Sequence, residues 1–473
     1  MMPKPMPWNI KDIIEATGGR TVMGSGDHVF DGISIDSRTI SGTDMFVAIR
    51  GNIHDGHNFI DQVAKEGGKG FIINEKSVAF IVNILRGRTD VSVVSVDDTV
   101  RALGDMAAFQ KTRSGVKAVA ITGSNGKTST RGLTESVFKQ KFSTLATRGN
   151  FNNEIGLPLT LLRLSDEYDW AVVELGMNRS GEIKTLAEIS SPDIGIITNI
   201  SAAHIEGLGS IEGVIKAKAE LIEHVSPSGL IILNADDPRV YAMAKDAEAD
   251  VLLYGFSENA EIRASKVTQE GYGHRFLLTT PSGKTQMDLP LPGGFMISNA
   301  MAAAAAGYSA GLSLPEIRAG VEDFNPEHGR MSIIHTRKGI TIIDDTYNAN
   351  PASMEAAIKT LCSLKKGSNG YLVAGDMLEM GFYAEKVHHD VGAFAAKADI
   401  SGIYATGRYA EDVANGAMRE KMDARHIYYG PKEDIVERLK HTLSHPDWVL
   451  VKGSRGMKME TIVADLKEWG GIS

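Results

Sequence analysis

Apolar and polar positions change their spacing along the chain in a way that predicts alternating strands and helices. From residue 116 onward, short apolar runs typical of buried strands precede stretches with helical spacing, which favours βαβ units in a parallel sheet. The expected strands are 116–122, 170–175, 194–199 and 230–234, and the expected helices are 127–140, 180–189 and 210–225. Short strands and glycine-bearing turns at 260–290 predict an antiparallel addition, followed by helices at 299–310 and 314–324.

The two ends of the chain carry separate series of short apolar runs. The first series comprises 29–33, 45–49, 70–73 and 91–96, and a helix at 97–112, capped by Asp97, follows it. The last series predicts strands at 339–343, 371–374, 403–405 and 448–451. With a length of 473 residues, this organisation predicts an α/β protein of about three domains, at 1–95, 96–327 and 328–473.

Composition and charge exclude several classes of protein. Hydrophobic residues make up 42% of the chain and charged residues 23%, which argues against global disorder or a coiled coil. The net charge of −9 argues against a broad nucleic-acid-binding surface. The single cysteine, Cys362, excludes an intrachain disulfide, and no apolar run is long enough for a transmembrane helix. We therefore expect a cytoplasmic protein without membrane insertion.

The strongest motif joins the expected strand 116–122 to the helix that follows it. Its residues are Thr122, Gly123, Ser124, Asn125, Gly126, Lys127 and Thr128. Glycines let backbone N–H groups close around phosphate oxygens, and the helix N-terminus adds a positive dipole end. In such a loop the lysine reaches the β- and γ-phosphates and the threonine hydroxyl binds Mg²⁺. Ala120 stands where the full pattern has its first glycine, and the alternative interpretation is a tight turn that only opens a helix.

Lys218 interrupts the apolar stripe of the helix expected at 210–225. The apolar residues of that helix lie three, four and seven positions away: Ile211, Val214, Ile215, Leu221, Ile222 and Val225. Burial would lower the pKa of the lysine amine, and a neutral amine can capture CO₂ as a carbamate, which is an oxygen ligand for a hard cation. Two alternatives, taken together, are as well supported as the carbamate. Either the lysine side chain reaches the surface, or it pairs with a carboxylate of another element.

Polar residues also stand at the ends of the expected strands. Glu174 closes one strand, Asn199 closes the next, and His204 follows five residues later. In an open parallel sheet, ligands bind beyond the carboxyl ends of the strands. We therefore expect Thr128, Glu174 and His204 to converge on one magnesium-phosphate site. Histidine is a less usual ligand for Mg²⁺, and a lone histidine is more often a capping or core residue.

Four further polar segments admit both a functional and a structural interpretation. The loop 150–156 either contacts substrate or only caps a turn, and Arg330 either bridges two domains to a nucleotide phosphate or is solvated. In the segment 344–353, Asn350 and Pro351 suit a helix cap and a first helical residue, whereas the polar residues before them have no such structural explanation. The segment 452–456 either cradles an anion or forms only a turn.

Together these segments resemble the Mur ligase family, the ATP-dependent amide-forming ligases of bacterial cell-wall synthesis. The resemblance spans nearly the whole chain: 36–38, 55–57, 122–128, 149–156, 173–177, 203–207, 216–220, 344–350, 375–381 and 452–455. It implies an N-terminal domain that holds the UDP end of the substrate, a central P-loop ATPase domain with a parallel sheet, and a C-terminal Rossmann-like domain. It also implies UDP-N-acetylmuramoyl-tripeptide and D-alanyl-D-alanine as substrates.

The resemblance further implies ATP, two Mg²⁺ ions and a carbamate on Lys218. The implied catalytic residues are Lys127, Lys218, His204 and Glu174, and the implied metal ligands are Thr128, Glu174, His204 and carbamylated Lys218. ATP would contact the 122–128 loop together with Asn299, Arg330, Asp345 and Tyr347. The expected substrate-binding residues are Ser37, Arg38, Asp55, Gly56, His57, Asn152, Asn153, Asn348, Ser454 and Arg455. We expect a monomer.

Two other functions are compatible with these motifs. Another ligase of the same superfamily, such as a folylpolyglutamate synthase or an earlier Mur ligase, would share the ATP machinery and differ in the N-terminal domain and substrate pockets. A nucleotide-binding switch would need the phosphate loop but no carbamate, so a buried Lys218 argues against it.

Overall fold

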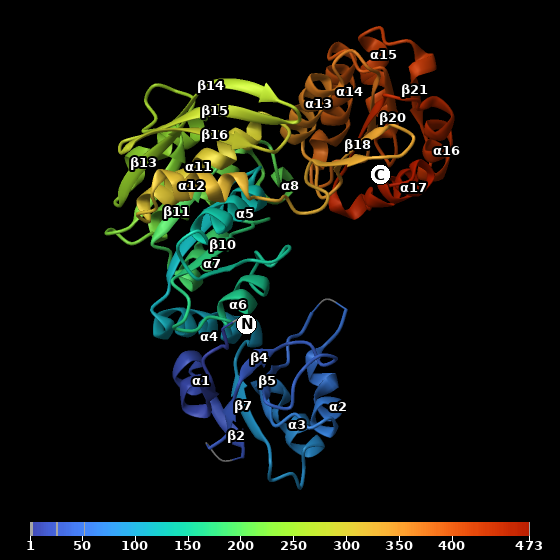
Figure 1. The fold of residues 1–473 in the computed structure, drawn as a ribbon. Helices are drawn as coiled ribbons and strands as arrows, with labels where there is room; N and C mark the ends of the chain where they lie inside the picture. The colour runs from blue at the N-terminus through green and yellow to red at the C-terminus, as the bar shows by residue number, and fades with distance from the viewer. Residues whose placement is uncertain (1–2, 25–26, 52, 473) are drawn as a thin grey trace.

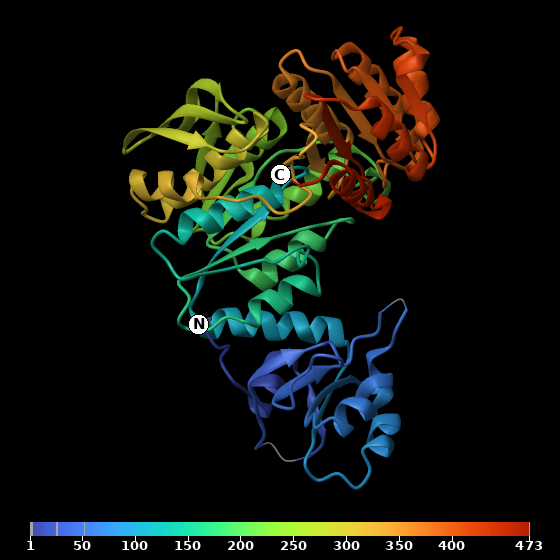
Figure 2. The ribbon, with the colours of Figure 1, turned by 45° about the vertical axis from the view of Figure 1, so that its right-hand side comes forward.

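A computed structural model describes residues 3–24, 27–51 and 53–472. Its sheets fall into three parts that follow one another along the chain (Figure 1). The part built by the first hundred residues lies at one end of the molecule, and the last part packs against the middle one (Figure 2). The α/β architecture expected from the sequence is confirmed.

The first part combines a five-stranded sheet with a small antiparallel pair. The sheet order is β2 (Arg20–Met23), β7 (Ser92–Val96), β6 (Gly70–Asn74), β5 (Asp44–Val47) and β4 (Gly32–Ser34), with only β2 antiparallel to its neighbour. The pair joins β1 (Trp8–Asn9) to β3 (Val29–Phe30), and the helices are α1 (Ile10–Thr17), α2 (Ile60–Lys65) and α3 (Val78–Ile84). Each of the four apolar runs predicted here contains a strand.

Helix α4 (Thr99–Ser114) connects the first part to the second. It contacts α1 on one side and α6 (Gly156–Leu161) and α7 (Glu182–Ser190) on the other. Its N-cap is Asp98, whose carboxylate accepts hydrogen bonds from the backbone of Val100 and Arg101, so the expected cap at Asp97 is one residue early.

The second part is built on a nine-stranded sheet. Its order is β16 (Gly283–Leu289), β15 (Gly273–Thr280), β14 (Ile262–Glu270), β13 (Asp250–Gly255), β12 (Leu230–Asn234), β11 (Ile194–Ile197), β8 (Lys117–Thr122), β10 (Trp170–Glu174) and β9 (Thr144–Ala146). Strands β14, β15 and β16 pair antiparallel, as predicted, and the other pairs are parallel. Strand β13 extends the parallel series beyond the four strands expected.

Helices cover both faces of this sheet because its central strands are apolar on both sides. In β8, Ala118 and Ala120 face one core, whereas Val119 and Ile121 face the other. Helices α5 (Lys127–Phe138), α11 (Phe295–Ser309) and α12 (Leu314–Glu322) contribute to the second core. Helices α6, α7 and α9 (Ile211–Ala219) contribute to the first core, and the short helices are α8 (Ile205–Leu208) and α10 (Pro238–Tyr241).

The third part carries a six-stranded sheet. Its order is β17 (Ser332–His335), β18 (Thr341–Asp345), β22 (Trp448–Lys452), β19 (Gly370–Ala374), β20 (Gly402–Ala405) and β21 (Ile427–Tyr429), with only β17 antiparallel. Edge strands β17 and β21 were not predicted. The helices are α13 (Pro351–Lys365), α14 (Ala384–Lys397), α15 (Ala410–Arg419), α16 (Lys432–Thr442) and α17 (Glu460–Gly470). Asn350 caps α13 and Pro351 is its first residue, as predicted.

Short 3₁₀ helices complete the chain: η1 (Gly56–Phe59), η2 (Glu75–Ser77), η3 (Ile222–His224), η4 (Ala242–Asp246), η5 (Gly381–Tyr383), η6 (Ala424–His426) and η7 (Arg455–Met457). No helix within the described ranges combines the length and apolar character needed to cross a membrane.

Candidate active site

The loop between β8 and α5 turns tightly because of its two glycines. Gly123 has a φ of +150° and Gly126 a φ of +80°, both in the region that favours glycine. A Cβ on Gly123 would overlap the Thr198 hydroxyl, and a Cβ on Gly126 would overlap the Asn299 side chain. The sequence therefore needs glycine at both positions to bring the backbone N–H groups of the loop to the N-terminus of α5.

Neighbouring strands hold this loop in place. The Asn199 side chain beyond β11 accepts a hydrogen bond from the Asn125 backbone at 2.9 Å and donates one to its carbonyl at 2.9 Å. The Ser124 hydroxyl donates to the Ser201 carbonyl at 3.1 Å and accepts from its N–H at 2.9 Å. The buried Thr122 hydroxyl donates to the Leu175 carbonyl at 3.0 Å. These contacts exist because β8 lies between β10 and β11 in the sheet.

Thr128 and Glu174 meet at the first turn of α5, as the sequence predicted. The Thr128 hydroxyl donates to Glu174 Oε2 at 2.7 Å and accepts from Arg330 Nη2 at 2.7 Å. The other carboxylate oxygen, Oε1, accepts from Asn152 Nδ2 at 2.8 Å. Glu174 is buried, with 3% of its surface exposed, and these polar contacts fix its orientation.

The amines of two lysines, Lys127 of α5 and Lys218 of α9, interact with each other electrostatically. Lys127 Nζ donates to the Gly123 carbonyl at 2.8 Å, and burial lowers its pKa while Glu174 opposes that shift. Lys218 is 1% exposed, and its amine forms no hydrogen bond or ion pair with any described residue. Burial first, and then the Lys127 charge, hold the pKa of Lys218 well below its ordinary value of 10.5. The Lys218 side chain therefore neither reaches the surface nor pairs with a described carboxylate.

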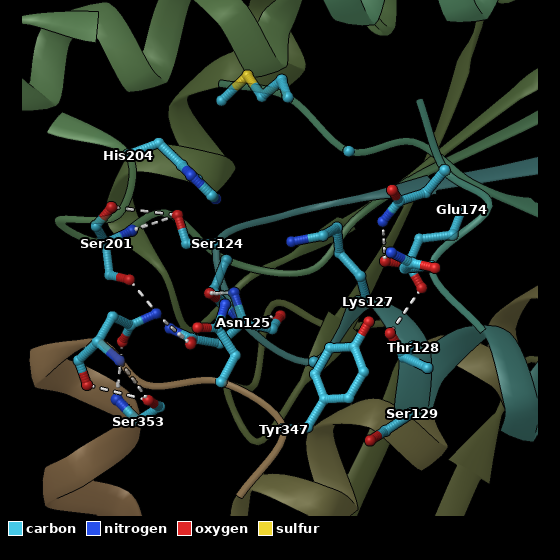
Figure 3. Close-up of a pocket in the computed structure, with 18 of the residues that line it drawn as sticks. Ser124, Asn125, Lys127, Thr128, Ser129, Glu174, Ser201, His204, Tyr347 and Ser353 are labelled. Atoms are coloured by element: carbon cyan, nitrogen blue, oxygen red, sulfur yellow. Dashed lines mark hydrogen bonds between the residues drawn. The ribbon is translucent and has the colours of Figure 1, made fainter. Parts of the chain in front are cut away.

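His204 lies at the same end of the site and contacts the third part of the molecule. Its Nδ1 is 2.6 Å from Glu379 Oε2, and the Glu206 backbone donates to the Glu379 carbonyl at 3.3 Å. The hydrogen bond with His204 lowers the pKa of Glu379. In Figure 3 the side chains of His204 and Lys127 both point toward the middle of the cavity.

The opposite wall is formed by residues before β17, at the ends of β18 and β22, and in the segment after β18. Arg330 stacks on the Tyr347 ring, with 3.9 Å between the guanidinium carbon and the ring centroid. Lys452 pairs with Asp345 at 2.5 Å and donates to the Asn348 carbonyl at 2.9 Å. The Asn350 side chain crosses to the phosphate loop and donates to Asn125 Oδ1 at 2.7 Å.

Most of these groups line one cavity of about 1210 Å³ between the second and third parts of the molecule, whereas Lys218 and Glu379 are not among its lining residues. Residues from both parts line it, among them Lys127, Thr128, Glu174, Asn299, Tyr347 and Arg455. Within residues 3–24, 27–51 and 53–472, no three His, Cys, Asp or Glu side chains are close enough to hold a metal ion.

Comparisons with known proteins agree with this arrangement. The model of the Mur ligase middle domain matches residues 121–307, that of the Mur ligase glutamate ligase domain matches 329–455, and that of the Mur ligase family catalytic domain matches 29–111. The chain is 36% identical to the UDP-N-acetylmuramoyl-tripeptide–D-alanyl-D-alanine ligase of Escherichia coli strain K12, over 94% of this chain and 95% of the relative. The chain belongs to the Mur ligase family.

Two further proteins are similar to this Mur ligase over nearly its full length. It is 34% identical to the ligase of the same name from Bacillus subtilis strain 168, over 93% of this chain and 94% of that protein. A crystal structure of MurF from Acinetobacter baumannii superposes with a TM-score of 0.88 at 31% identity, over 98% of this chain and 100% of that one.

The substrate candidates in the N-terminal part of this Mur ligase lie outside the cavity. Arg38 makes a two-pronged ion pair with Asp36, at 2.8 and 2.7 Å, and this hydrogen bonding lowers the pKa of Asp36 to about 2. The neighbouring Ser37 is also partly accessible. His57 is buried: its Nδ1 is 2.6 Å from Asp55 and its Nε2 accepts the Asn74 N–H at 2.9 Å. Both ring nitrogens thus have structural partners.

Three more candidates have structural partners, and two of them, Asn153 and Arg455, line the cavity. Asn153 accepts backbone hydrogen bonds from Ile155 and Gly156 at the start of α6, at 3.2 and 2.8 Å. Ser454 accepts from the Leu378 N–H at 2.9 Å and donates to a carbonyl of the 344–350 segment. Arg455 pairs with Glu460 at 3.2 Å. The close packing of Gly56 against the Ile49 backbone explains that glycine structurally.

Sequence reasoning missed the residues that act across the boundary between the sheets. Glu379 was part of a recognised segment, but nothing in its spacing pointed to His204. Asn350 was interpreted only as a helix cap, yet it also bonds Asn125. Lys452 is the last residue of the buried strand β22 and is 3% exposed, and a lysine at the end of an apolar run was a usable signal for its pairing with Asp345.

Proposed function

We propose that this chain is an ATP-dependent ligase that joins D-alanyl-D-alanine to UDP-N-acetylmuramoyl-tripeptide and releases ADP and phosphate. The reaction would serve peptidoglycan precursor synthesis in the cytoplasm, and the active form would be a monomer. The observation that carries this proposal is the cavity in which the phosphate loop faces Arg330, Tyr347 and Asn350 of the third part. Similarity over nearly the full length to ligases of that activity supports the choice of substrates.

The chemistry requires activation of a carboxylate. Hydroxide is a poor leaving group, so the terminal carboxylate of the tripeptide first attacks the γ-phosphorus of ATP and becomes an acyl phosphate, with ADP leaving. The D-alanyl-D-alanine amine then attacks the acyl carbon, and the tetrahedral oxyanion collapses with release of phosphate. The loop N–H groups and the Lys127 ammonium would offset the charge between the two anions in the first step.

The donor set at the head of α5 fits a hard cation. A hydroxyl oxygen and a carboxylate oxygen lie 2.7 Å apart at Thr128 and Glu174, and the remaining ligands would include phosphate oxygens. Bound Mg²⁺, two ions in our proposal, would supply charge neutralisation at the phosphates. Thr128, Glu174, His204 and a carbamate on Lys218 would hold them. A neutral Lys218 amine adds CO₂ to give a carbamate anion and one proton, and the lowered pKa favours that neutral form.

We assign roles to the remaining predicted residues from their positions in the sequence motifs and the structure. Asn299, Arg330, Asp345 and Tyr347 would contact ATP. Asn152, Asn153, Asn348, Ser454 and Arg455 would contact the tripeptide end and D-alanyl-D-alanine. Ser37, Arg38 and the Asp55-Gly56-His57 turn would lie near the uridine diphosphate. We also propose the domain divisions 1–95, 96–327 and 328–473, with the third domain excluding water that would hydrolyse the acyl phosphate.

The test is phosphate release from ATP with UDP-N-acetylmuramoyl-tripeptide, measured with and without D-alanyl-D-alanine and combined with the product mass. Both the meso-diaminopimelate and the L-lysine tripeptides are supplied. We expect release that depends on the dipeptide and a product heavier by one dipeptide minus water. Stimulation by an amino acid but not by D-alanyl-D-alanine would replace this function with that of another ligase of the superfamily. Nucleotide binding without turnover in any mixture would indicate a switch.

A further inference from the structure

His204 and Glu379 meet across the boundary between the second and third parts with unusual backbone geometry on both sides. His204 has a φ of +56° and Glu379 a φ of +64°, a left-handed conformation that residues with a Cβ rarely adopt. Such conformations persist where the surrounding structure enforces them, and they concentrate at functional sites. The pair joins the turn before α8 to the turn before η5.

The hydrogen bond between them fixes the proton on the imidazole. An ionised carboxylate only accepts hydrogen bonds, so the 2.6 Å contact with Glu379 Oε2 requires the proton on His204 Nδ1. In the neutral ring, Nε2 then keeps its lone pair. His204 lines the cavity and its ring points toward the space that Lys127 enters (Figure 3).

The carboxylate and the imidazole belong to different sheets. Glu379 follows β19 of the third part, whereas His204 follows β11 of the second. The Glu206 backbone also bonds the Glu379 carbonyl at 3.3 Å, so the contact forms only when the third part is docked in this position. A carboxylate that orients a histidine through its second ring nitrogen is common where the histidine binds a metal.

We propose that Glu379 is a positioning residue that acts through His204. Docking of the third part brings Glu379 to Nδ1, and this selects the tautomer and direction in which Nε2 faces the phosphate end of the cavity. The central domain would therefore complete its site only when the C-terminal domain has closed on it. This role rests on the proposed function of the cavity as a site of phosphoryl transfer.

Other contacts hold the two parts together without Glu379. Asn350 bonds Asn125 at 2.7 Å, and Arg330 bonds Thr128 at 2.7 Å. Away from the cavity, the Ser363 hydroxyl donates to Gln269 at 2.6 Å. The Glu379 side chain is 52% exposed, so its loss removes little buried surface. A substitution there should consequently affect His204 more than docking.

The test compares Glu379→Ala, Glu379→Gln and the control Glu385→Gln. Glu385 is an exposed carboxylate of the same part and forms no hydrogen bond or ion pair with a described residue. Alanine retains the Cβ and hence the backbone strain at position 379. Glutamine retains an oxygen that can accept the Nδ1 proton, so it should rescue the alanine effect in part.

The first readout is the nitrogen spectrum of histidine-labelled protein without ligands, in which His204→Gln assigns the signal among the 13 histidines. We expect the Nδ1–H form in the wild type, in Glu379→Gln and in Glu385→Gln, and a mixture of tautomers in Glu379→Ala. The second readout is steady-state turnover. We expect kcat to fall about 10- to 100-fold in Glu379→Ala, with little change in the KM for either peptide substrate.

An unchanged His204 spectrum in both Glu379 variants would overturn the proposal, and so would an unchanged kcat in Glu379→Ala. Should the alanine variant fail to fold, Glu379→Leu, which also lacks an acceptor for the Nδ1 proton, replaces it and is compared with Glu385→Gln in both readouts. A spectral change in a protein that turns over none of the proposed substrates would leave the positioning role intact and refute the proposed function. The two failures are thereby distinguishable.

Discussion

Replacing Gly126 by alanine should damage the phosphate loop by two separable effects. Gly126 has a φ of +80°, and alanine in the left-handed region costs about 1–2 kcal/mol. A Cβ there would also overlap Asn299 Oδ1 and approach Asn299 Cγ to 3.2 Å. Asn299 is 5% exposed, so it must leave its preferred rotamer inside a packed core, at a cost of about 0.5–1.5 kcal/mol. The total loss of unfolding free energy should be about 1.5–3.5 kcal/mol.

Gly311 provides a matched control for the backbone effect. Its φ is +81°, it follows α11 in the same part of the molecule, and a Cβ there would meet nothing within 4 Å. Gly311→Ala should therefore lower the unfolding free energy only by the backbone cost, about 1–2 kcal/mol. Combining Gly126→Ala with Asn299→Ala removes the overlap, so the double variant should be more stable than the sum of the single effects predicts.

The measurements are urea unfolding of the four variants and calorimetric titration with ATP. We expect Gly126→Ala to weaken ATP binding at least about tenfold, equivalent to about 1.4 kcal/mol, because the methyl group enters the loop that would surround the phosphates. Gly311→Ala should bind ATP as the wild type does. The reasoning is refuted if Gly126→Ala is no less stable than Gly311→Ala, or if the effects of Gly126→Ala and Asn299→Ala on stability are additive.

Three other outcomes are expected. Lys218→Ala should abolish turnover while ATP binding survives, and full activity of that variant, measured by phosphate release, would contradict a carbamate role. Burial lowers the pKa of His388 below its ordinary 6.5, so the unfolded chain binds a proton that the folded chain does not. Stability should therefore fall as pH drops from 6.5 toward the folded pKa, by up to about 1.4 kcal/mol per pH unit, and urea unfolding of His388→Gln should lack that slope. Tyr272, in the turn between β14 and β15, has its ring centroid 5.3 Å from that of His335 and 5.7 Å from that of Trp448. Tyr272→Ala removes these contacts, so amide hydrogen exchange in β17 should accelerate. Unchanged exchange there would show that the β14–β15 hairpin does not stabilise the third part.

Local pattern alone predicted most of the fold. Buried parallel strands are continuous apolar runs, and the runs before the phosphate loop, Glu174 and Asn199 were all recognised as strands because their side chains face a core on both sides. Edge strands β17 and β21 were not predicted: they are only four and three residues long, and none of their residues is fully buried, so neither forms a long apolar run. The apolar stripe around Lys218 indicated that burial was one of the possibilities, since helical periodicity fixes which residues share a face, and the structure shows the residue to be 1% exposed.

Only the tertiary structure decided which polar residues meet. Glu379 and His204 are 175 positions apart, and Asn350 and Asn125 are 225 apart, so no local spacing relates them. The order of strands in the sheets and the docking of the third part on the second bring them within hydrogen-bond distance. The same docking gave Asn350 a second partner beyond its helix and set Arg330 between Thr128 and Tyr347. Sequence determines what each segment can bury, whereas the packing of whole sheets determines which ends of those segments face one another.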